Sequence, residues 1–585
     1  MEKRNEKIPD PKEIEKEISE FLAKRFNNTV KIVSPVVVPQ ELSLEKRNKP
    51  DKKKKKIIFN LLPEELIDYL DQYIVKQDNA KAILATKICT HFNRIKQAEE
   101  NPNRINSMVG SIKNNVLMLG PTGVGKTYII KLIADKIGVP FVKGDGTKFS
   151  ETGYVGGDVE DLVRDLVREA DDDIELAQCG IIYIDEIDKI AGSRNFIGAD
   201  VSRSGVQRAL LKPMEETEVD LKVPNDPISM IQEIERFRKT GKRKSRMVNT
   251  KNILFIMSGA FADLTEIIKK RIMDQGIGFG SQLKNKNDIA GLLEKVSSED
   301  LIKFGFESEF VGRLPVRAVF ENLNEDDLLE ILKNPNNPII LGKKLDFAAY
   351  GIDIKFEESA LRILSKNASL ENTGARGIVS SVEKALLSFE KKLPSSNVKK
   401  FPVTKSVITD PEKSLDAIIA APEDSKIISS YQKLTESEIG YIKTYLKDSS
   451  SNLGNKYNLT MTPARINILA SYYSRHIIDI ENAIKKIKEH YDEVKKIELY
   501  FFKNHDINIV LEEEAVDYII DKFINTDIVL DDFYKQLSQD FKHALNLVRE
   551  KTGKNRFFIT KDALIDPESF VRDLIRKQTE FEIDK

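Results

Sequence analysis

With 585 residues, the chain is too long for one hydrophobic core, and we expect about three or four domains of about 150 residues each. Its 92 basic and 93 acidic side chains give a formal net charge of -1, which argues against a global attraction to nucleic acid or to an anionic membrane. Its two cysteines, Cys89 and Cys179, are too few for a disulfide framework or a four-cysteine zinc site, so we expect neither.

The first 60 residues have the features of an appendage that ends in a basic linker. Residues 3–26 carry apolar side chains at helical spacing, and residues 30–38 are rich in strand-forming residues. Consecutive lysines at 52–56 then indicate a solvated tether, with a contact to nucleic acid or lipid as the alternative. The N-terminus lacks an apolar segment typical of a secretory signal, and no stretch of about 18 apolar residues occurs, so we expect a cytoplasmic protein without membrane contact.

Residues 61–320 alternate short apolar runs with charged amphipathic segments. The runs at 115–119, 180–184 and 252–257 have the length and composition of buried parallel strands. Their alternation with helices predicts the α/β class, with a doubly wound parallel sheet that binds ligands at the carboxyl ends of its strands. Residues 321–422 should form a smaller helical domain with one pair of strands.

The remaining segment, residues 423–585, is predicted to be a mostly helical extension. We interpret its residues 490–580 as a degenerate repeat of the small domain. Two pairs of segments match in the same order: 343–360 with 495–515, and 403–412 with 559–568. Chance similarity between charged helical segments is the alternative.

A phosphate-binding loop is predicted directly after the first apolar strand. Eight residues fit the pattern G-x-x-x-x-G-K-[ST] and open a helix: Gly120, Pro121, Thr122, Gly123, Val124, Gly125, Lys126 and Thr127. The glycines allow successive backbone N–H groups to point at phosphate oxygens, and the helix N-terminus adds a partial positive charge. We expect Lys126 to reach the β- and γ-phosphates of ATP and Thr127 to help hold Mg²⁺.

The second part of the predicted site lies about sixty residues later, where the strand at 181–184 is followed by Asp185 and Glu186. An aspartate at the end of a strand next to the phosphate-binding loop can hold Mg²⁺ through water. The glutamate after it can polarise the water that attacks the γ-phosphate. We therefore predict that Asp185 is a metal-binding residue and that Glu186 is the catalytic base.

Five segments resemble motifs of the AAA+ unfoldases ClpX and HslU, in that family's order. They are Gly-Tyr-Val-Gly at 153–156, Ile-Ile-Tyr-Ile-Asp-Glu-Ile-Asp-Lys-Ile at 181–190, Ser-Gly-Ala-Phe at 258–261, Glu-Phe-Val-Gly-Arg-Leu-Pro at 309–315 and Thr-Gly-Ala-Arg-Gly at 373–377. The ClpX branch is the closer match, because residues 276–280 and 301–305 also resemble it. The resemblance covers about residues 61–422 and implies an AAA+ P-loop ATPase with a helical small domain.

The resemblance implies roles for further residues. Ile74 and Val75 would be apolar walls around the adenine, although the residues alone indicate a core position. Ser258 occupies the sensor 1 position, where a small polar side chain can orient the attacking water. Arg313 matches the arginine finger, which acts on the ATP of a neighbouring subunit, and Arg376 matches sensor 2, which touches the nucleotide from the small domain. A finger that acts in trans implies a ring, which in this family is a homo-hexamer.

The same resemblance indicates what the hydrolysis serves. Tyr154 and Val155, flanked by glycines, match the pore loop that grips a polypeptide in the axial channel. A second channel loop is expected at 193–204, and a basic loop at 236–246, whose Arg-Lys-Ser replaces the Arg-Lys-His of ClpX. Ile277, Gly278 and Phe279 match the loop by which ClpX docks on the ClpP peptidase ring. A glycine-rich turn is the alternative interpretation.

The chain departs from the family at both ends. We expect no N-terminal zinc domain, and the extension at 423–585 is additional. If the extension duplicates the small domain, the second copy has lost the sensor 2 arginine, since Thr-Asp-Ile-Val-Leu stands at 526–530. Our hypothesis is that the extension has a role in ring packing or partner recognition.

The leading interpretation is an ATP-dependent unfoldase and translocase that uses ATP and Mg²⁺ and feeds unfolded or tagged proteins to a ClpP-like peptidase. A remodelling chaperone that works without a peptidase is the first alternative. A nucleic-acid motor is disfavoured by the neutral net charge and by Tyr154. A scaffold that does not hydrolyse ATP is disfavoured because every expected nucleotide-site residue is present.

Overall fold

The computed structural model describes residues 59–100, 113–149, 158–192, 201–221, 247–275, 289–525, 530–553 and 555–583. These residues belong to one compact unit, Lys56–Lys585. The predictions for the N-terminal appendage and its lysine run lie outside the described residues. None of the described helices combines the length and hydropathy that a membrane crossing requires.

A five-stranded sheet forms the centre of the first domain, in the order β2-β3-β6-β1-β7, with every neighbouring pair parallel. The strands are β1 (Val116–Leu119), β2 (Phe141–Asp145), β3 (Ile181–Asp185), β6 (Leu254–Gly259) and β7 (Val316–Val319). Three of them, β1, β3 and β6, coincide with the predicted apolar runs. The other two carry polar residues (Lys143 in β2 and Arg317 in β7), which explains why hydrophobicity alone did not reveal them.

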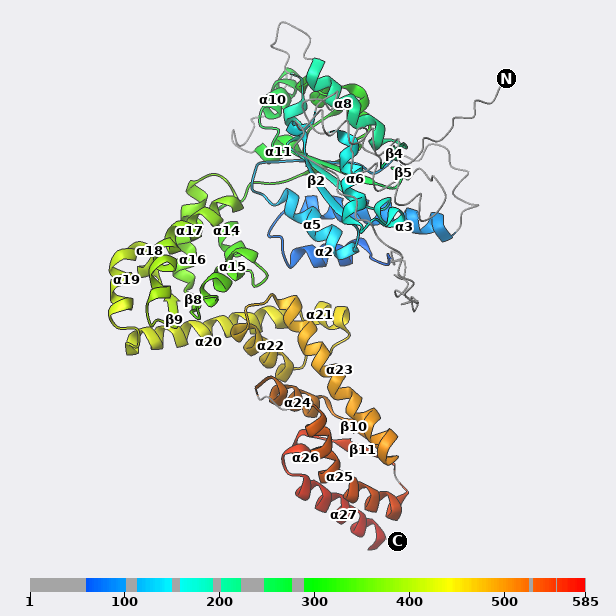
Figure 1. Ribbon diagram of the computed structural model, residues 1–585, viewed down its shortest axis with the longest axis vertical. Helices are drawn as coiled ribbons and strands as arrows, with labels where there is room; N and C mark the ends of the chain where they lie inside the picture. Colours follow the sequence, from blue (N-terminus) through cyan, green and yellow to red (C-terminus); the bar gives the residue numbers. More distant parts are fainter. Residues whose placement is uncertain are drawn as a thin grey trace, which may run out of the picture. The chain divides into compact units, whose positions relative to one another are not determined.

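The three central strands, β3, β6 and β1, are buried on both faces, as their continuous apolar sequences predict. Alternate residues of each strand enter one of two cores; Leu117 and Ile182 belong to the first, and Met118 and Tyr183 belong to the second. Figure 1 shows α2, α3 and α5 on one face of the sheet and α6, α8 and α10 on the other. The sheet order places the carboxyl ends of β3 and β6 beside the end of β1, where the phosphate-binding loop begins.

The helices of the first domain, with a short antiparallel pair of strands, complete the layers around the sheet. Their bounds are α2 (Pro63–Asp71), α3 (Asp78–Glu100), α5 (Lys126–Ile137), α6 (Val159–Glu169), α7 (Ile174–Ala177), α8 (Val201–Met214), β4 (Glu218–Asp220), β5 (Met247–Asn249), α10 (Leu264–Gln275), α11 (Ile289–Leu293), α12 (Ser298–Phe304) and α13 (Ser308–Gly312).

The second domain has its own core and the single pair of strands that the sequence predicts. β8 (Asp353–Phe356) runs parallel to β9 (Lys400–Val403). Its helices are α14 (Glu325–Lys333), α15 (Pro338–Ala348), α16 (Glu358–Leu370), α17 (Ala375–Lys392), α18 (Lys405–Thr409) and α19 (Pro411–Ala420). Its core extends from Leu328 to Ile418.

The C-terminal region is mostly helical and has a separate core. Its elements are α20 (Ser425–Asp448), α21 (Ser450–Tyr457), α22 (Pro463–Arg475), α23 (Ile480–His505), β10 (Asn508–Leu511), α24 (Glu513–Asn525), α25 (Leu530–Thr552), β11 (Arg556–Ile559), α26 (Lys561–Ile565) and α27 (Pro567–Ile583). Helix α20 joins the two parts, because Ile427 packs on the core of the small domain and Ile442 is buried in the core of the C-terminal region.

The two strand pairs outside the central sheet have the same surroundings. β10 and β11 are parallel, as β8 and β9 are. One further backbone hydrogen bond extends each pair: the N–H of Glu357 donates to the Val403 carbonyl at 2.9 Å beside β8 and β9, and the N–H of Glu512 donates to the Ile559 carbonyl at 3.1 Å beside β10 and β11. A helix of 13 residues follows the first strand of each pair, α16 in one and α24 in the other. A helix of 5 residues follows the second strand, α18 in one and α26 in the other. This agreement supports the proposed duplication of the small domain.

Candidate active site

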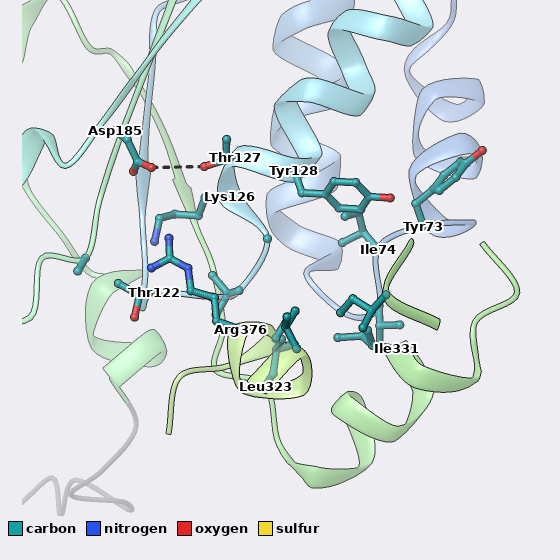
Figure 2. A pocket seen from close by; sticks show the side chains of 18 of the residues that line it. Tyr73, Ile74, Thr122, Lys126, Thr127, Tyr128, Asp185, Leu323, Ile331 and Arg376 are labelled. Carbon is teal, nitrogen blue, oxygen red and sulfur yellow. Dashed lines mark hydrogen bonds between the residues drawn. The ribbon is translucent and has the colours of Figure 1, made fainter. Parts of the chain in front are cut away.

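A pocket of about 440 Å³ lies at the carboxyl ends of β1 and β3, where the small domain meets the large one. It brings together residues from four regions of the chain: the loop residues Thr122, Gly123, Val124, Gly125, Lys126 and Thr127; Asp185 and Glu186 at the end of β3; Ile74 and Val75 between α2 and α3; and Arg376 of α17. Figure 2 shows Ile74, Lys126, Asp185 and Arg376 around this pocket. Gly120 and Pro121 form the start of the same loop. All residues predicted for nucleotide binding, except Gly120 and Pro121, therefore line one cavity.

Lys126, the first residue of α5, is buried with its ammonium group inside the loop. Its Nζ donates to the carbonyl oxygens of Gly120 and Pro121, both at 2.6 Å. Burial lowers the pKa of Lys126 to about 8, and the positive charge of Arg376 acts in the same direction. A buried ammonium that is held only by carbonyl groups would gain strongly from an anionic phosphate, so the site is prepared for a polyanionic ligand.

Asp185 is held by a chain of hydroxyl groups. Ser258 Oγ donates to Asp185 Oδ1 at 2.7 Å, and the Tyr183 hydroxyl lies 2.6 Å from the same serine oxygen. Thr127 Oγ1 lies 3.0 Å from the Tyr183 hydroxyl and 3.4 Å from Asp185 Oδ2. Because Ser258 donates its proton to Asp185, the Tyr183 hydroxyl is the donor to Ser258. The chain fixes the orientation of the carboxylate next to Thr127 (Figure 2).

The ionised form of Asp185 is favoured by its neighbours. Partial burial by itself would raise the pKa of Asp185. The hydrogen bond from Ser258 and the ammonium group of Lys143, 3.0 Å from Oδ2, outweigh that effect and hold the pKa below its ordinary value. Asp185 therefore carries a negative charge at neutral pH, and an ionised carboxylate is a group that can hold a divalent cation.

Glu186 directly follows the strand and is exposed to the pocket. Its φ of 57° is in the left-handed region, which is uncommon for a residue with a side chain, and its backbone N–H donates to Asp185 Oδ1 at 3.1 Å. The turn separates the two adjacent carboxylates, because Asp185 is held by the hydroxyl chain and Glu186 remains directed into the open pocket. This arrangement allows different roles for the two side chains.

The opposite end of the pocket is apolar. Ile74, Leu323 and Ile331 lie there, and Tyr73 and Tyr128 stand beside them, away from Lys126 (Figure 2). An apolar cavity at one end and a charged loop at the other match the two chemical ends of a nucleotide, a planar base and a chain of phosphates.

Arg376 reaches the pocket from the small domain, because α17 begins directly against the phosphate-binding loop. The backbone N–H of Ala375 donates to the Gly123 carbonyl at 2.8 Å. Gly123 and Gly374 both have positive φ, +78° and +61°, and a Cβ on Gly374 would lie 2.8 Å from that same carbonyl oxygen. The approach of the two domains at this point therefore requires glycine at both positions.

Arg313 is not among the described residues that line this pocket. It follows α13, and its Nη2 lies 2.5 Å from Oε1 of Glu215 in the same chain, with about half of its side chain exposed. The backbone carbonyl of Arg313 accepts a hydrogen bond from Asn115 at 3.2 Å, just before β1. The backbone of Arg313 is thus held next to β1, and its half-exposed guanidinium group pairs with Glu215 and is not among the described groups that line the pocket.

Three predicted functional segments lie outside the described residues. They are the pore-loop residues Tyr154 and Val155, the docking residues Ile277, Gly278 and Phe279, and the basic loop at 236–246. The expected second channel loop also falls there as far as residue 200, and α8 begins at Val201.

Four residues that support the site or Arg313 were given no role in the sequence analysis: Tyr183, Lys143, Gly374 and Glu215. Tyr183 and Gly374 lie inside the motifs at 181–190 and 373–377. Tyr183 had a usable signal, because residues two apart in a strand share a face and Tyr183 precedes Asp185 by two. Lys143 approaches Asp185 only through the pairing of β2 with β3, in which Asp145 is opposite Asp185. The pairing of Glu215 with Arg313 spans almost a hundred residues and has no local signal.

Comparison with known proteins agrees with this architecture. The family model described as AAA domain (Cdc48 subfamily) matches residues 112–317. The ATP-dependent Clp protease ATP-binding subunit ClpX of Treponema denticola is 40% identical over 337 residues, which cover 57% of this chain and 77% of the relative. The protein of the same name from Borrelia duttonii is 40% identical over 349 residues, which cover 59% and 78%. The expected AAA+ fold is confirmed, and the chain belongs to the ClpX family of AAA+ ATPases.

Proposed function

We propose that this chain is the ATPase subunit of a ring that unfolds proteins and threads them through a central pore, into a ClpP-type peptidase. The observation that carries the proposal is the separation of Arg313 from the pocket that holds the other catalytic residues. A complete site needs a positive charge on the γ-phosphate, and an exposed arginine outside its own pocket is positioned to supply that charge to a neighbour.

The residues of the pocket suggest how hydrolysis proceeds. The loop amides and Lys126 bind the phosphates, and the apolar end around Ile74 and Val75 accepts the adenine. Glu186 takes a proton from the attacking water, and Arg376 contacts the nucleotide from the small domain. Ser258 contributes by keeping Asp185 ionised and oriented. These groups lie in or beside the cavity, and Arg313 of a neighbouring subunit would complete the site.

Thr127 and Asp185 fit a role in holding Mg²⁺, since a hydroxyl and an ionised carboxylate lie 3.4 Å apart beside the loop. Within the described residues, no group of three or more histidine, cysteine, aspartate or glutamate side chains is arranged to hold a metal ion alone. Phosphate oxygens and water would therefore complete the coordination. When bound, the ion neutralises charge on the phosphates.

The mechanical role rests on the sequence and on the relatives. Tyr154 and Val155 are proposed to grip the polypeptide, and Ile277, Gly278 and Phe279 are proposed to dock on the peptidase. Two relatives are named as ATP-binding subunits of an ATP-dependent Clp protease, which supports a peptidase partner for this homo-hexamer. ATP and Mg²⁺ are the proposed cofactors.

A Glu186→Gln variant tests the proposal, because it should bind ATP without hydrolysing it and keep substrates in the ring. Cells that express the tagged variant should yield an ATP-dependent ring that retains unfolded proteins, whereas a Lys126→Ala control should retain none. If Glu186→Gln forms no ring and retains no proteins, the unfoldase proposal is wrong. A second variant, Phe279→Ala, separates the two modes of action: degradation should stop if a peptidase docks there and continue if the chain is a remodelling chaperone.

A further inference from the structure

The C-terminal region contacts the apolar end of the nucleotide pocket. Tyr73, which lines the pocket beside Ile74, donates its hydroxyl proton to Glu481 Oε2 at 2.8 Å, across 408 positions of sequence. Glu481 is in the first turn of α23. One wall of the pocket is thus held in place by a residue that lies outside both ATPase domains.

The charge of Glu481 makes this hydrogen bond a strong one. Burial alone would raise the pKa of Glu481, but the Tyr73 hydroxyl and the ammonium groups of Lys456 and Lys485 outweigh burial and lower the pKa to about 2. Lys456 lies 3.4 Å from the same carboxylate and also lies over the ring of Tyr69, which packs against Tyr73. Hydrogen bonds to an ionised acceptor are stronger than bonds between neutral groups.

A second contact is made by the side chain of Asn336, which lies in the loop between α14 and α15. Its amide nitrogen donates to the backbone carbonyl of Gln72 at 3.1 Å, next to Tyr73, and its amide oxygen accepts from the backbone N–H of Ile480 at 3.1 Å. Two other residues of this loop, Asn334 and Asn337, line the pocket. One side chain therefore connects the large domain, the small domain and the start of α23.

A third contact fixes the C-terminal region to the small domain. Glu438 of α20 forms ion pairs with Lys344 and with Lys355, the second at 2.6 Å. Lys355 also donates to the carbonyl oxygen of Ser474 at 2.7 Å. Both lysines are buried, and a buried charge is costly without a partner, so the two ammonium groups need the carboxylate of Glu438 from the C-terminal region. The region is consequently attached to the large domain through Tyr73 and to the small domain through Lys344 and Lys355.

We infer that the C-terminal region positions the adenine-side wall of the pocket through the Tyr73–Glu481 hydrogen bond, and so sets the affinity for the nucleoside part of ATP. The inference rests on the proposed function only in that the pocket binds ATP. Tyr73 and Glu481 are positioning residues, because the bond orients the segment that carries Ile74 and Val75. The phosphate-binding loop lies at the other end of the pocket and does not depend on this bond.

The experiment compares two ligands on the purified full-length protein, ADP and inorganic tripolyphosphate, by isothermal titration calorimetry. Tyr73→Phe removes only the hydroxyl, and Glu481→Ala removes the acceptor. Each should weaken ADP binding about threefold to tenfold, as expected for one hydrogen bond, and leave tripolyphosphate binding unchanged. The double variant should bind ADP with about the affinity of the single variant that binds it less tightly, since both changes remove the same hydrogen bond. In hydrolysis assays the loss should appear in KM, with kcat retained.

Two matched variants complete the test. Glu489→Ala changes an exposed carboxylate on the same helix that pairs with Lys486, and it should bind both ligands as the unaltered protein does. Glu481→Gln keeps an oxygen that can accept the Tyr73 proton, and it should recover ADP affinity relative to Glu481→Ala. Unchanged ADP affinity in Tyr73→Phe and Glu481→Ala, or equal losses for ADP and tripolyphosphate, would overturn the inference. If the unaltered protein binds neither ADP nor ATP, the proposed function fails instead.

Discussion

Ser258 Oγ lies 2.7 Å from Oδ1 of Asp185, although 73 positions separate the two residues. β6 lies between β3 and β1 in the sheet, so its last residues stand between Asp185 and the phosphate-binding loop. Ser258 is fully buried, and its oxygen also contacts the Tyr183 hydroxyl. The serine at this position therefore acts on the aspartate that is proposed to hold the metal ion.

Replacement of Ser258 by alanine should lower kcat about tenfold and shift the pH dependence of hydrolysis. The serine hydrogen bond stabilises the carboxylate, so its loss allows the pKa of Asp185 to rise. Hydrolysis needs the ionised form of Asp185. As the pH is lowered, the variant should therefore lose activity at a higher pH than the unaltered protein does. Steady-state rates from about pH 3.5, near the ordinary pKa of an aspartate, to about pH 8 measure both effects. An unchanged acid limb would show that Ser258 does not tune Asp185.

The affinity for nucleotide should fall as the pH rises above about 8. Burial lowers the pKa of Lys126 to about 8 in the protein without nucleotide, and nearby phosphates favour the ammonium form, so the pKa in the complex is higher. Binding therefore takes up a proton between those two pKa values, and it weakens with increasing pH in that window. Titration calorimetry of ADP at about pH 7 and about pH 9, in buffers of different ionisation enthalpy, measures the affinity and the proton uptake. Equal affinities at both pH values would contradict this prediction.

Gly374→Ala should weaken nucleotide binding without unfolding the small domain. The φ of Gly374 is +61°, and the added methyl group would lie 2.8 Å from the Gly123 carbonyl oxygen, so α17 should move away from the loop and carry Arg376 with it. We expect a rise in KM for ATP of about tenfold or more. Gly342→Ala is the matched control, since a Cβ there meets nothing within 4 Å and its φ is not positive. Circular dichroism of both variants checks that the helices are intact.

Arg313 should act on the ATP of a neighbouring subunit, and mixed rings test this directly. Arg313→Ala and Glu186→Gln should each abolish hydrolysis alone. In a mixture, an Arg313→Ala subunit keeps Glu186 and can receive Arg313 from a Glu186→Gln neighbour, so part of the activity should return.

Two measurements accompany the mixing experiment. Arg313→Ala should bind ADP with unchanged affinity, because the arginine is not among the described residues that line its own pocket. Glu215→Gln weakens the ion pair that holds Arg313 within its own chain, and it should not reduce hydrolysis. Absence of any recovery on mixing would place the action of Arg313 within one subunit.

The C-terminal region should depend on the buried pair of Arg465 and Asp517. Arg465 is fully buried; its Nε donates to Asp517 Oδ1 at 2.7 Å, and its Nη2 lies 2.8 Å from Glu513 Oε2. Asp517→Ala would leave the guanidinium without its buried partner and should cost about 3–5 kcal/mol of stability. Glu514→Ala, on the exposed side of the same helix, should cost less than about 0.5 kcal/mol. Thermal unfolding followed by circular dichroism measures both changes.

The sequence by itself determined the parts of this protein that depend on neighbouring residues. The loop from Gly120 to Thr127 needs only its glycines, its lysine and the helix that follows, and Asp185 was found from the apolar strand before it. The alternation of strands and helices gave the α/β class, because a strand that is buried on both faces must be apolar along its whole length. The matching segments near β8 and β10 could also be found from the sequence, because each is a continuous run of neighbouring residues.

Only the tertiary structure decided which of these residues meet. The order of the sheet brings Ser258, Tyr183 and Lys143 to Asp185, and no local pattern encodes that order. The contact between Tyr73 and Glu481 depends on how the C-terminal region packs on the ATPase domains, across most of the chain. Side-chain contacts at such separations are set by the shapes and charges of surfaces that exist only after each domain has folded. For that reason the sequence predicted the residues of the candidate nucleotide site, and the structure revealed which contacts hold them in position.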